Sequence, residues 1–195
     1  MSEPARAFDN VANAPSVEAA YLAVPPERIA EIIDGELHVL PRPRTRHTRA
    51  ATKLGARLDG PFDQGEGGPG GWIFLIEPEL HLGLRPDKIG PDLAGWTRDR
   101  MPELPDVAAI TLSPDWVCEV LSESTAATDR GRKMRIYRRE SVGHYWLVDP
   151  VLRTLEVYRL ASGQWLVVDT WEGDVKVRAE PFDAVELDLA LLWAR

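Results

Sequence analysis

The sequence contains a single cysteine, Cys118, among its 195 residues. One cysteine excludes an intrachain disulfide and a zinc site built from several thiolates. The chain also has no run of about 18 apolar residues, so we expect no membrane-spanning helix. Its first residues lack the basic start and the apolar stretch of a secretory signal peptide. We therefore expect a cytoplasmic protein with no membrane partner.

The chain has fewer basic than acidic residues, with 23 Lys and Arg against 31 Asp and Glu, and its net charge is -8. This balance excludes a protein that is basic over its whole surface, although a local basic groove remains open because the distribution of charge matters more than its sum. Six basic residues lie within 42–57 and six more within 130–139. A solvated helix face explains either segment alone, but two such segments favour a phosphate-binding groove. The residues expected to contact DNA are Arg44, Arg46, Arg49, Lys53, Arg130 and Arg132.

Apolar residues make up 44% of the chain, which is enough to build a sizeable core. We expect a flexible N-terminal tail over residues 1–16 and a single domain over 17–195. The polar dipeptide Asp34-Gly35, between two apolar runs, predicts a β-hairpin.

The order of the expected elements predicts a mixed α/β fold, in which a central mixed sheet is flanked by helices. We expect helices at 17–24, 47–62 and 125–141, the last ending at Gly143. One or two strands are expected at 72–83, and further strands at 89–96, 115–122, 144–150, 154–160 and 164–173. The segment 184–193 is either a closing strand or a terminal helix.

Pro-Asp occurs four times in the chain, and the context singles out Asp92 in "GPDLAGW". Asp87 precedes Lys88 in what we expect to be a polar turn, Asp106 closes a polar loop and Asp115 opens a strand. Asp92 instead stands between a polar loop and an apolar strand, where an ionised carboxylate is costly without a partner. A turn cap is the simpler alternative for this residue.

The second acidic residue that needs explaining is Glu119 in "WVCEVLS", a strand expected to be buried on both faces. Two carboxylates on neighbouring strands repel each other, and a divalent cation between them removes the repulsion. Mg²⁺, or Mn²⁺ in its place, suits a site with few carboxylates, several waters and substrate phosphate. Such a metal supports phosphodiester hydrolysis. A buried ion pair between Glu119 and an arginine is the alternative.

Further candidates lie on the neighbouring expected elements. Lys133, on the basic helix, could orient the attacking water or stabilise the developing charge; Tyr137, four residues on, shares its face. His47 is a candidate phosphate contact or proton carrier, and Glu31 a candidate water-bridged metal contact. Each also has a plain alternative, as a solvated or core residue. Glu77 and Glu79 rank lower.

Three blocks of the sequence resemble one known family. The blocks are "AEIIDGELHVLPRPRTRHTRA", "GPDLAGWTRDRMPELP" and "SPDWVCEVLSESTAATDRGRKMRIYRRESVGHYWLVDP". In order and spacing they resemble the Uma-two type putative restriction endonuclease family of the PD-(D/E)XK nuclease superfamily, over roughly Tyr21 to Trp171. The resemblance implies a restriction-endonuclease-like core with an N-terminal hairpin and a magnesium-dependent hydrolytic site.

The resemblance also implies roles for individual residues. Asp92 matches the aspartate of the "PD" motif and Glu119 the acidic residue of the "(D/E)XK" motif, with the backbone carbonyl of Val120 as a third metal ligand. Glu31 and His47 match the acidic and histidine positions of the N-terminal blocks. One departure is Leu121, which stands where the superfamily usually has its lysine, and Lys133 is the natural substitute.

The leading interpretation is a Mg²⁺-dependent endodeoxyribonuclease that acts on DNA, with a duplex as the expected form. A catalytically degenerate module that keeps the scaffold and binds nucleic acid or protein is the first alternative. A plain α/β structural domain, whose acids pair with arginines, is the second. A homodimer is one option for a duplex cutter, and the apolar end "LALLW" could bury against a twin subunit or close its own core.

Overall fold

The structure, a computed structural model, describes residues 15–84 and 86–193. The expected tail lies outside these residues except for its last two, of which Ser16 accepts a hydrogen bond from the Ala19 backbone N–H and caps the first helix. In the described ranges no helix combines the length and apolarity needed to cross a membrane. Cytoplasmic localisation and the assignment of 17–195 to one domain stay predictions.

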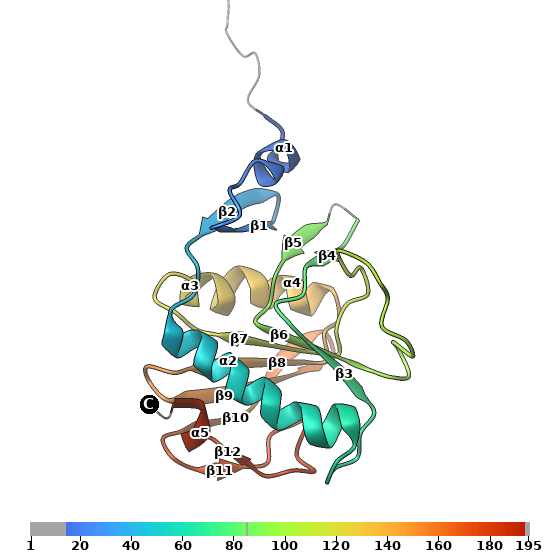
Figure 1. Ribbon diagram of the computed structural model, residues 1–195, viewed down its shortest axis with the longest axis vertical. Helices are drawn as coiled ribbons and strands as arrows, with labels where there is room; N and C mark the ends of the chain where they lie inside the picture. The colour runs from blue at the N-terminus through green and yellow to red at the C-terminus, as the bar shows by residue number, and fades with distance from the viewer. Residues whose placement is uncertain (1–14, 85, 194–195) are drawn as a thin grey trace, which may run out of the picture.

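A six-stranded sheet, called here the large sheet, forms the centre of the molecule (Figure 1). Its order is β10-β9-β8-β7-β6-β3; β7 and β8 run parallel and the other neighbours antiparallel. The expected mixed α/β class is therefore confirmed. The strands are β3 (Trp72–Ile76), β6 (Leu93–Thr97), β7 (Trp116–Val120), β8 (His144–Asp149), β9 (Thr154–Ala161) and β10 (Gln164–Glu172).

Helices cover both faces of the large sheet, and the residues of β7 show why. Trp116, Cys118 and Val120 belong to the core cluster under α2, whereas Val117 and Leu121 belong to the cluster under α4. This alternation is that of a strand buried on both sides, as expected for "WVCEVLS". The helices are α1 (Val17–Leu22), α2 (Thr45–Leu58) continued by η1 (Asp59–Gln64), then α3 (Ala126–Thr128), η2 (Asp129–Lys133) and α4 (Met134–Arg139).

The C-terminal segment closes the core cluster under α2. It contains β11 (Lys176–Val177), β12 (Leu187–Asp188) and α5 (Ala190–Trp193). Leu189 and Leu192 are buried in the same cluster as Leu54. The apolar end "LALLW" therefore closes its own core, and dimerisation stays a prediction.

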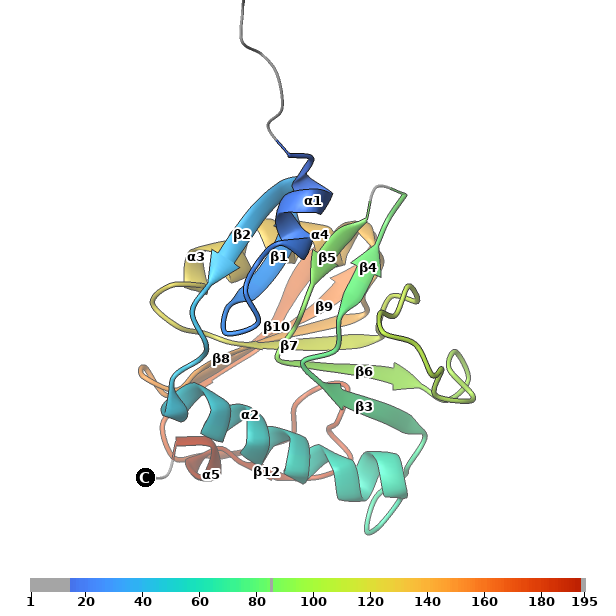
Figure 2. The same ribbon diagram turned by 45° about the horizontal axis from the view of Figure 1, so that its top comes forward.

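A second, antiparallel sheet, called here the small sheet, stands over one end of the large one (Figure 2). Its order is β2-β1-β5-β4, with β1 (Ile29–Ile33), β2 (Glu36–Leu40), β4 (Leu80–Leu82) and β5 (Asp87–Ile89). The expected hairpin is present, and Asp34 and Gly35 turn it with φ angles of 52° and 78°. Positive φ at both positions is the requirement of a two-residue hairpin turn.

The chain passes from the small sheet to the large one at Gly90-Pro91-Asp92. The sequence predicted one strand over 89–96, but β5 ends at Ile89 and β6 begins at Leu93. Because proline lacks a backbone N–H, Pro91 cannot donate to a strand ladder at this point. The break leaves Asp92 at the junction of the two sheets.

Two local expectations were wrong. The polar turn expected at Asp87 and Lys88 is a buried strand, in which the Asp87 carboxylate accepts hydrogen bonds from the Asp34 N–H and from Arg139. The helix expected over 125–141, with Gly143 terminating it, ends at Arg139, and Ser141 takes the positive φ, 61°. Gly143 is needed instead for close packing, since a Cβ there would lie 3.0 Å from the carbonyl oxygen of Asp115.

Candidate active site

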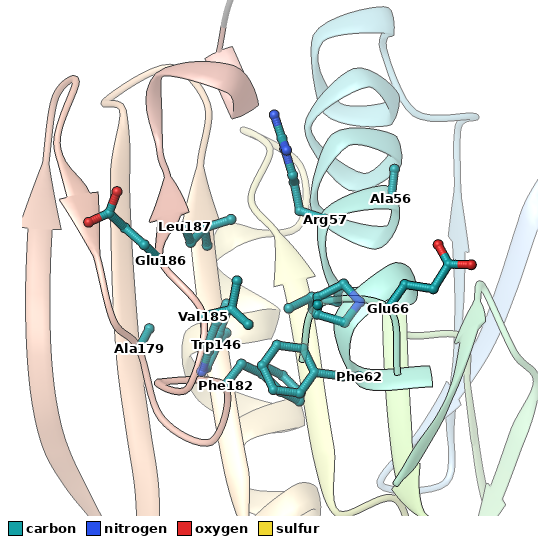
Figure 3. A pocket seen from close by; sticks show the side chains of 13 residues that line it. Ala56, Arg57, Phe62, Glu66, Trp146, Ala179, Phe182, Val185, Glu186 and Leu187 are labelled. Atoms are coloured by element: carbon teal, nitrogen blue, oxygen red, sulfur yellow. The ribbon is translucent and has the colours of Figure 1, made fainter. Parts of the chain in front are cut away.

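Of two cavities among the described residues, the larger holds a group of buried charges and the smaller does not. The smaller one, of about 230 Å³, lies between α2 and the C-terminal segment and is floored by Phe62, Trp146 and Phe182 (Figure 3). The larger one, of about 1050 Å³, lies at the junction of the two sheets and is lined by Glu31, Asp92, Glu119, Asp129 and Lys133, among others. The larger cavity is therefore the candidate active site.

Asp92 immediately precedes β6, and Glu119 lies on the adjacent strand β7. Leu93 of β6 pairs with Cys118 of β7, so the residues that precede and follow this pair, Asp92 and Glu119, are neighbours across the ladder. The Val120 backbone N–H donates to Asp92 Oδ2 over 2.6 Å, which fixes the Asp92 carboxylate against β7. The structure thus brings together the two acids that the sequence singled out.

Glu119 is 2% exposed and is held by two donors from the helical segment above it. Tyr137 donates its hydroxyl to Glu119 Oε1 over 2.7 Å, and Lys133 Nζ lies 3.3 Å from the same oxygen. Lys133 therefore points into the cavity region, as the nuclease interpretation requires. The buried cation beside Glu119 is a lysine and not the arginine of the structural-domain alternative.

Lys133 also contacts two further carboxylates. Its Nζ lies 2.8 Å from Glu31 Oε1 on β1 and 3.7 Å from Asp129 Oδ1, four residues before it. The Gly90 N–H donates to Glu31 Oε1 over 3.0 Å, which ties β1 to the junction between the sheets. We call Glu31, Glu119, Asp129, Lys133 and Tyr137 the buried cluster; none of its members is more than 3% exposed.

The buried cluster carries more potential negative charge than its single lysine can balance. Burial raises the pKa of Glu119 well above its usual value despite the nearby Lys133 ammonium, and raises that of Asp129 to about 6. Burial alone would lower the pKa of Lys133, but the charges of Glu119, Glu31 and Asp129 outweigh it and raise the pKa well above its usual value. Lys133 is therefore a cation throughout the neutral range.

Some buried acceptors at this site have no hydrogen-bond partner. Among the described residues, the unsatisfied buried atoms include Glu31 Oε2, Asp129 Oδ1 and His47 Nδ1. Buried polar atoms in native structures are normally satisfied. Three of them around one cavity indicate room for a polar ligand.

His47, near the start of α2, faces Asp92. Its Nε2 lies 3.2 Å from Asp92 Oδ2. Burial lowers the pKa of His47, but the hydrogen bond and the charge of Asp92 outweigh it, and the net direction is upward. His47 therefore joins the site from the α2 side, while Glu119 and Lys133 join it from β7 and the helical segment.

The expected DNA-contacting residues divide into two groups. Arg44 and Arg46 line the large cavity together with Arg28 and Arg42. Arg49 and Lys53 lie further along α2 and do not line it, and Arg130 and Arg132 are ion-paired with Glu156 and Glu36. DNA contacts from any of these residues stay predictions.

Sequence reasoning missed Asp129, and a signal for it was present. Ala126, Asp129, Lys133 and Tyr137 recur at helical spacing, so the two charged residues occupy positions that apolar residues usually take on a packed helix. Of the lower-ranked candidates, Glu77 and Glu79 also line the cavity. Glu79 is paired with His81 over 2.6 Å.

The site has the type of ligand atom that a metal ion requires, but the described side chains do not form a complete coordination shell. Carboxylate oxygens, two of them unsatisfied, are the ligands that Mg²⁺ prefers. Within the described part of the chain, however, no three His, Cys, Asp or Glu side chains are placed to hold one ion together. Lys133 Nζ, in contact with three of the carboxylates, stands where they converge.

Comparison with known proteins identifies a family and a similar fold. The sequence profile of the Uma2 family, described as "Putative restriction endonuclease", matches residues 18–191. The fold is similar to the crystal structure of a putative nuclease belonging to DUF820 from Anabaena variabilis, with a TM-score of 0.72 and 19% identity over 93% of this chain and 98% of that one. No curated protein matches the sequence.

Proposed function

The chain belongs to the Uma2 family of restriction-endonuclease-type proteins, and from that premise we propose that it is a metal-dependent endonuclease that hydrolyses phosphodiester bonds of DNA. The core would then be of the restriction-endonuclease type. The observation that carries the proposal is the position of Asp92, immediately before β6, next to Glu119 of the adjacent β7, with Lys133 in contact with Glu119. Two acids and a lysine from three separate elements meet at one cavity.

Asp92, Glu119 and the carbonyl of Val120 are the proposed holders of Mg²⁺, for which Mn²⁺ could substitute. The ion, when bound, would supply a polarised water and stabilise charge on the phosphate oxygens. Glu31 Oε2 and Asp129 Oδ1, which have no hydrogen-bond partner, support this proposal because they leave buried acceptor capacity at the site. Glu31 is proposed to bind a water at the edge of the ion.

The chain's own groups supply the remaining chemistry. Lys133, a cation held among carboxylates, orients a water or stabilises charge developing on the phosphate. His47, against Asp92, contacts the phosphate or carries a proton away from the site. Arg44 and Arg46 at the cavity wall position the DNA backbone without reading its sequence.

A second candidate function is a catalytically degenerate module that binds nucleic acid. One observation favours it: Lys133 is engaged by three carboxylates, and no metal cage is complete among the described residues. This module would bind DNA through its arginines without cleaving it.

The test is cleavage of supercoiled plasmid and of a single-stranded DNA circle with Mg²⁺, with Mn²⁺ and with EDTA. Asp92→Asn and Glu119→Gln should abolish metal-dependent nicking, and Lys133→Met should lower its rate by at least about a hundredfold. Asp106→Asn is the matched control, because Asp106 follows a proline as Asp92 does but is exposed outside the cavity. Unchanged cleavage in all three site variants would reject the mechanism, and salt-sensitive binding without cleavage would select the degenerate module.

A further inference from the structure

We propose that the substrate is a single strand of DNA, or a strand unpaired from its complement, and not a continuous duplex. This inference rests on the proposed nuclease function and names its substrate class. The observations that carry it are the burial of the charged cluster, the size of the cavity and the chemistry of its lining.

Four members of the buried cluster line the large cavity although their side chains are almost fully buried. Glu31, Glu119 and Lys133 are 1%, 2% and 3% exposed, and the cavity has a volume of about 1050 Å³. That volume is at the upper end of the range that encloses a small molecule. It accommodates a few nucleotides of one strand, whereas a duplex brings a second strand and the flanking backbone with it. Enzymes whose reactive groups lie out of reach of a duplex act on single strands or on extruded nucleotides.

The first helix contributes to the lining of the cavity. Tyr21 and Leu22 of α1 line the cavity, together with residues 24–26 that follow it. α1 is attached to the small sheet by Lys88, whose Nζ lies 2.5 Å from Glu18 and 4.6 Å from the centre of the Tyr21 ring. Figure 2 shows α1 beside β1 and β5, on the small-sheet side of the junction. This attachment holds α1 in place as part of the cavity wall.

The cavity walls combine exposed apolar side chains with arginines. Leu22 and Val151 line the cavity while 73% and 65% exposed, and Arg42, Arg44 and Arg46 line it as well. The outside of a duplex is sugar and phosphate, which gains nothing from apolar contact. An unpaired strand presents base faces to apolar side chains and phosphates to arginines at the same time, which is how single-strand sites are built. The mixed lining therefore suits an unpaired strand.

The experiment measures binding, so that it does not depend on turnover. Three labelled DNAs are compared by fluorescence anisotropy in Ca²⁺: a dT strand, a duplex of equal length, and a duplex carrying an unpaired dT flap. We expect the strand and the flap to bind at least about tenfold more tightly than the duplex. Val151→Ser should weaken binding of the strand by about three- to fivefold and leave binding of the duplex unchanged. Val107→Ser is the matched control, because Val107 is 57% exposed but does not line the cavity.

The outcomes separate this inference from the function on which it rests. Equal or tighter binding of the duplex, together with metal-dependent nicking of plasmid, would overturn the single-strand inference and leave the nuclease proposal in place. An equal effect of Val151→Ser and Val107→Ser would also overturn it. Failure of all three DNAs to bind, with no cleavage of any of them in Mg²⁺ or Mn²⁺, would overturn both.

Discussion

Replacing Lys133 with methionine tests how far its positive charge stabilises the carboxylates of the buried cluster. Lys133 Nζ contacts Glu31 Oε1 at 2.8 Å, Glu119 Oε1 at 3.3 Å and Asp129 Oδ1 at 3.7 Å. Methionine keeps most of the side-chain volume but removes the only ammonium in these contacts. Removing one partner of a buried ion pair costs roughly 3–5 kcal/mol, because the remaining charge is left without compensation. We expect a loss of that size in the free energy of unfolding at pH 8.

The loss in free energy of unfolding caused by Lys133→Met should be smaller at lower pH. The pKa values of Glu119 and Asp129 are raised by burial, that of Asp129 to about 6, so at pH 5 protons reduce the charge that Lys133 would otherwise balance. The assay is urea unfolding followed by tryptophan fluorescence at pH 5 and pH 8. Lys176→Met is the control, because Lys176 forms an exposed pair with Glu186 and should leave stability nearly unchanged. A loss at pH 8 no larger than that of the control, or an equal loss at both pH values, would refute the reasoning.

Two further predictions concern single positions. The raised pKa of Asp129 lets the folded state keep a proton that the unfolded state gives up. The free energy of unfolding of the wild type should therefore fall as the pH rises from about 4 to about 6, and this group accounts for at most about 3 kcal/mol of the fall. Asp129→Asn should remove that slope in urea unfolding at a series of pH values, and an unchanged slope would contradict the prediction. Gly95→Ala should destabilise the chain by about 1–3 kcal/mol, since its Cβ would lie 2.9 Å from the Phe74 ring and 3.3 Å from Trp116. Thermal unfolding with no change in midpoint would contradict this second prediction.

The sequence predicted the elements around the site because their signals are local. Asp34-Gly35 fixes the hairpin through the turn geometry that it requires. The all-apolar flanks of Glu119 mark a strand buried on both faces, and both core clusters contain residues of that strand. Asp92 was singled out because a carboxylate after Pro91 and before an apolar strand needs a partner, and it has two, the Val120 N–H and His47.

What the sequence could not predict depends on distant segments. The small sheet joins β1 to β5 through Ile32 and Lys88, far apart in the chain, and no local pattern indicates that pairing. For the same reason Asp87 and Lys88 were misread as a polar turn: their partners are Asp34, Arg139 and Glu18. Buried charges of this kind look like solvated residues until the partners are known.

The position of the charges within the fold bears on the choice between a functional and a purely structural domain. A buried ion pair is seldom more stabilising than apolar residues of the same volume, and unbalanced buried carboxylates are worse. Here Glu31, Glu119 and Asp129 share one lysine, immediately beside an apolar cluster that contains Ile136 and Leu147. If stability alone had been selected, we would expect apolar residues in place of these three acids and the lysine. The fold instead places the acids at the junction of its two sheets, where the large cavity reaches them, and this cost in stability is accounted for if the acids act on a ligand there.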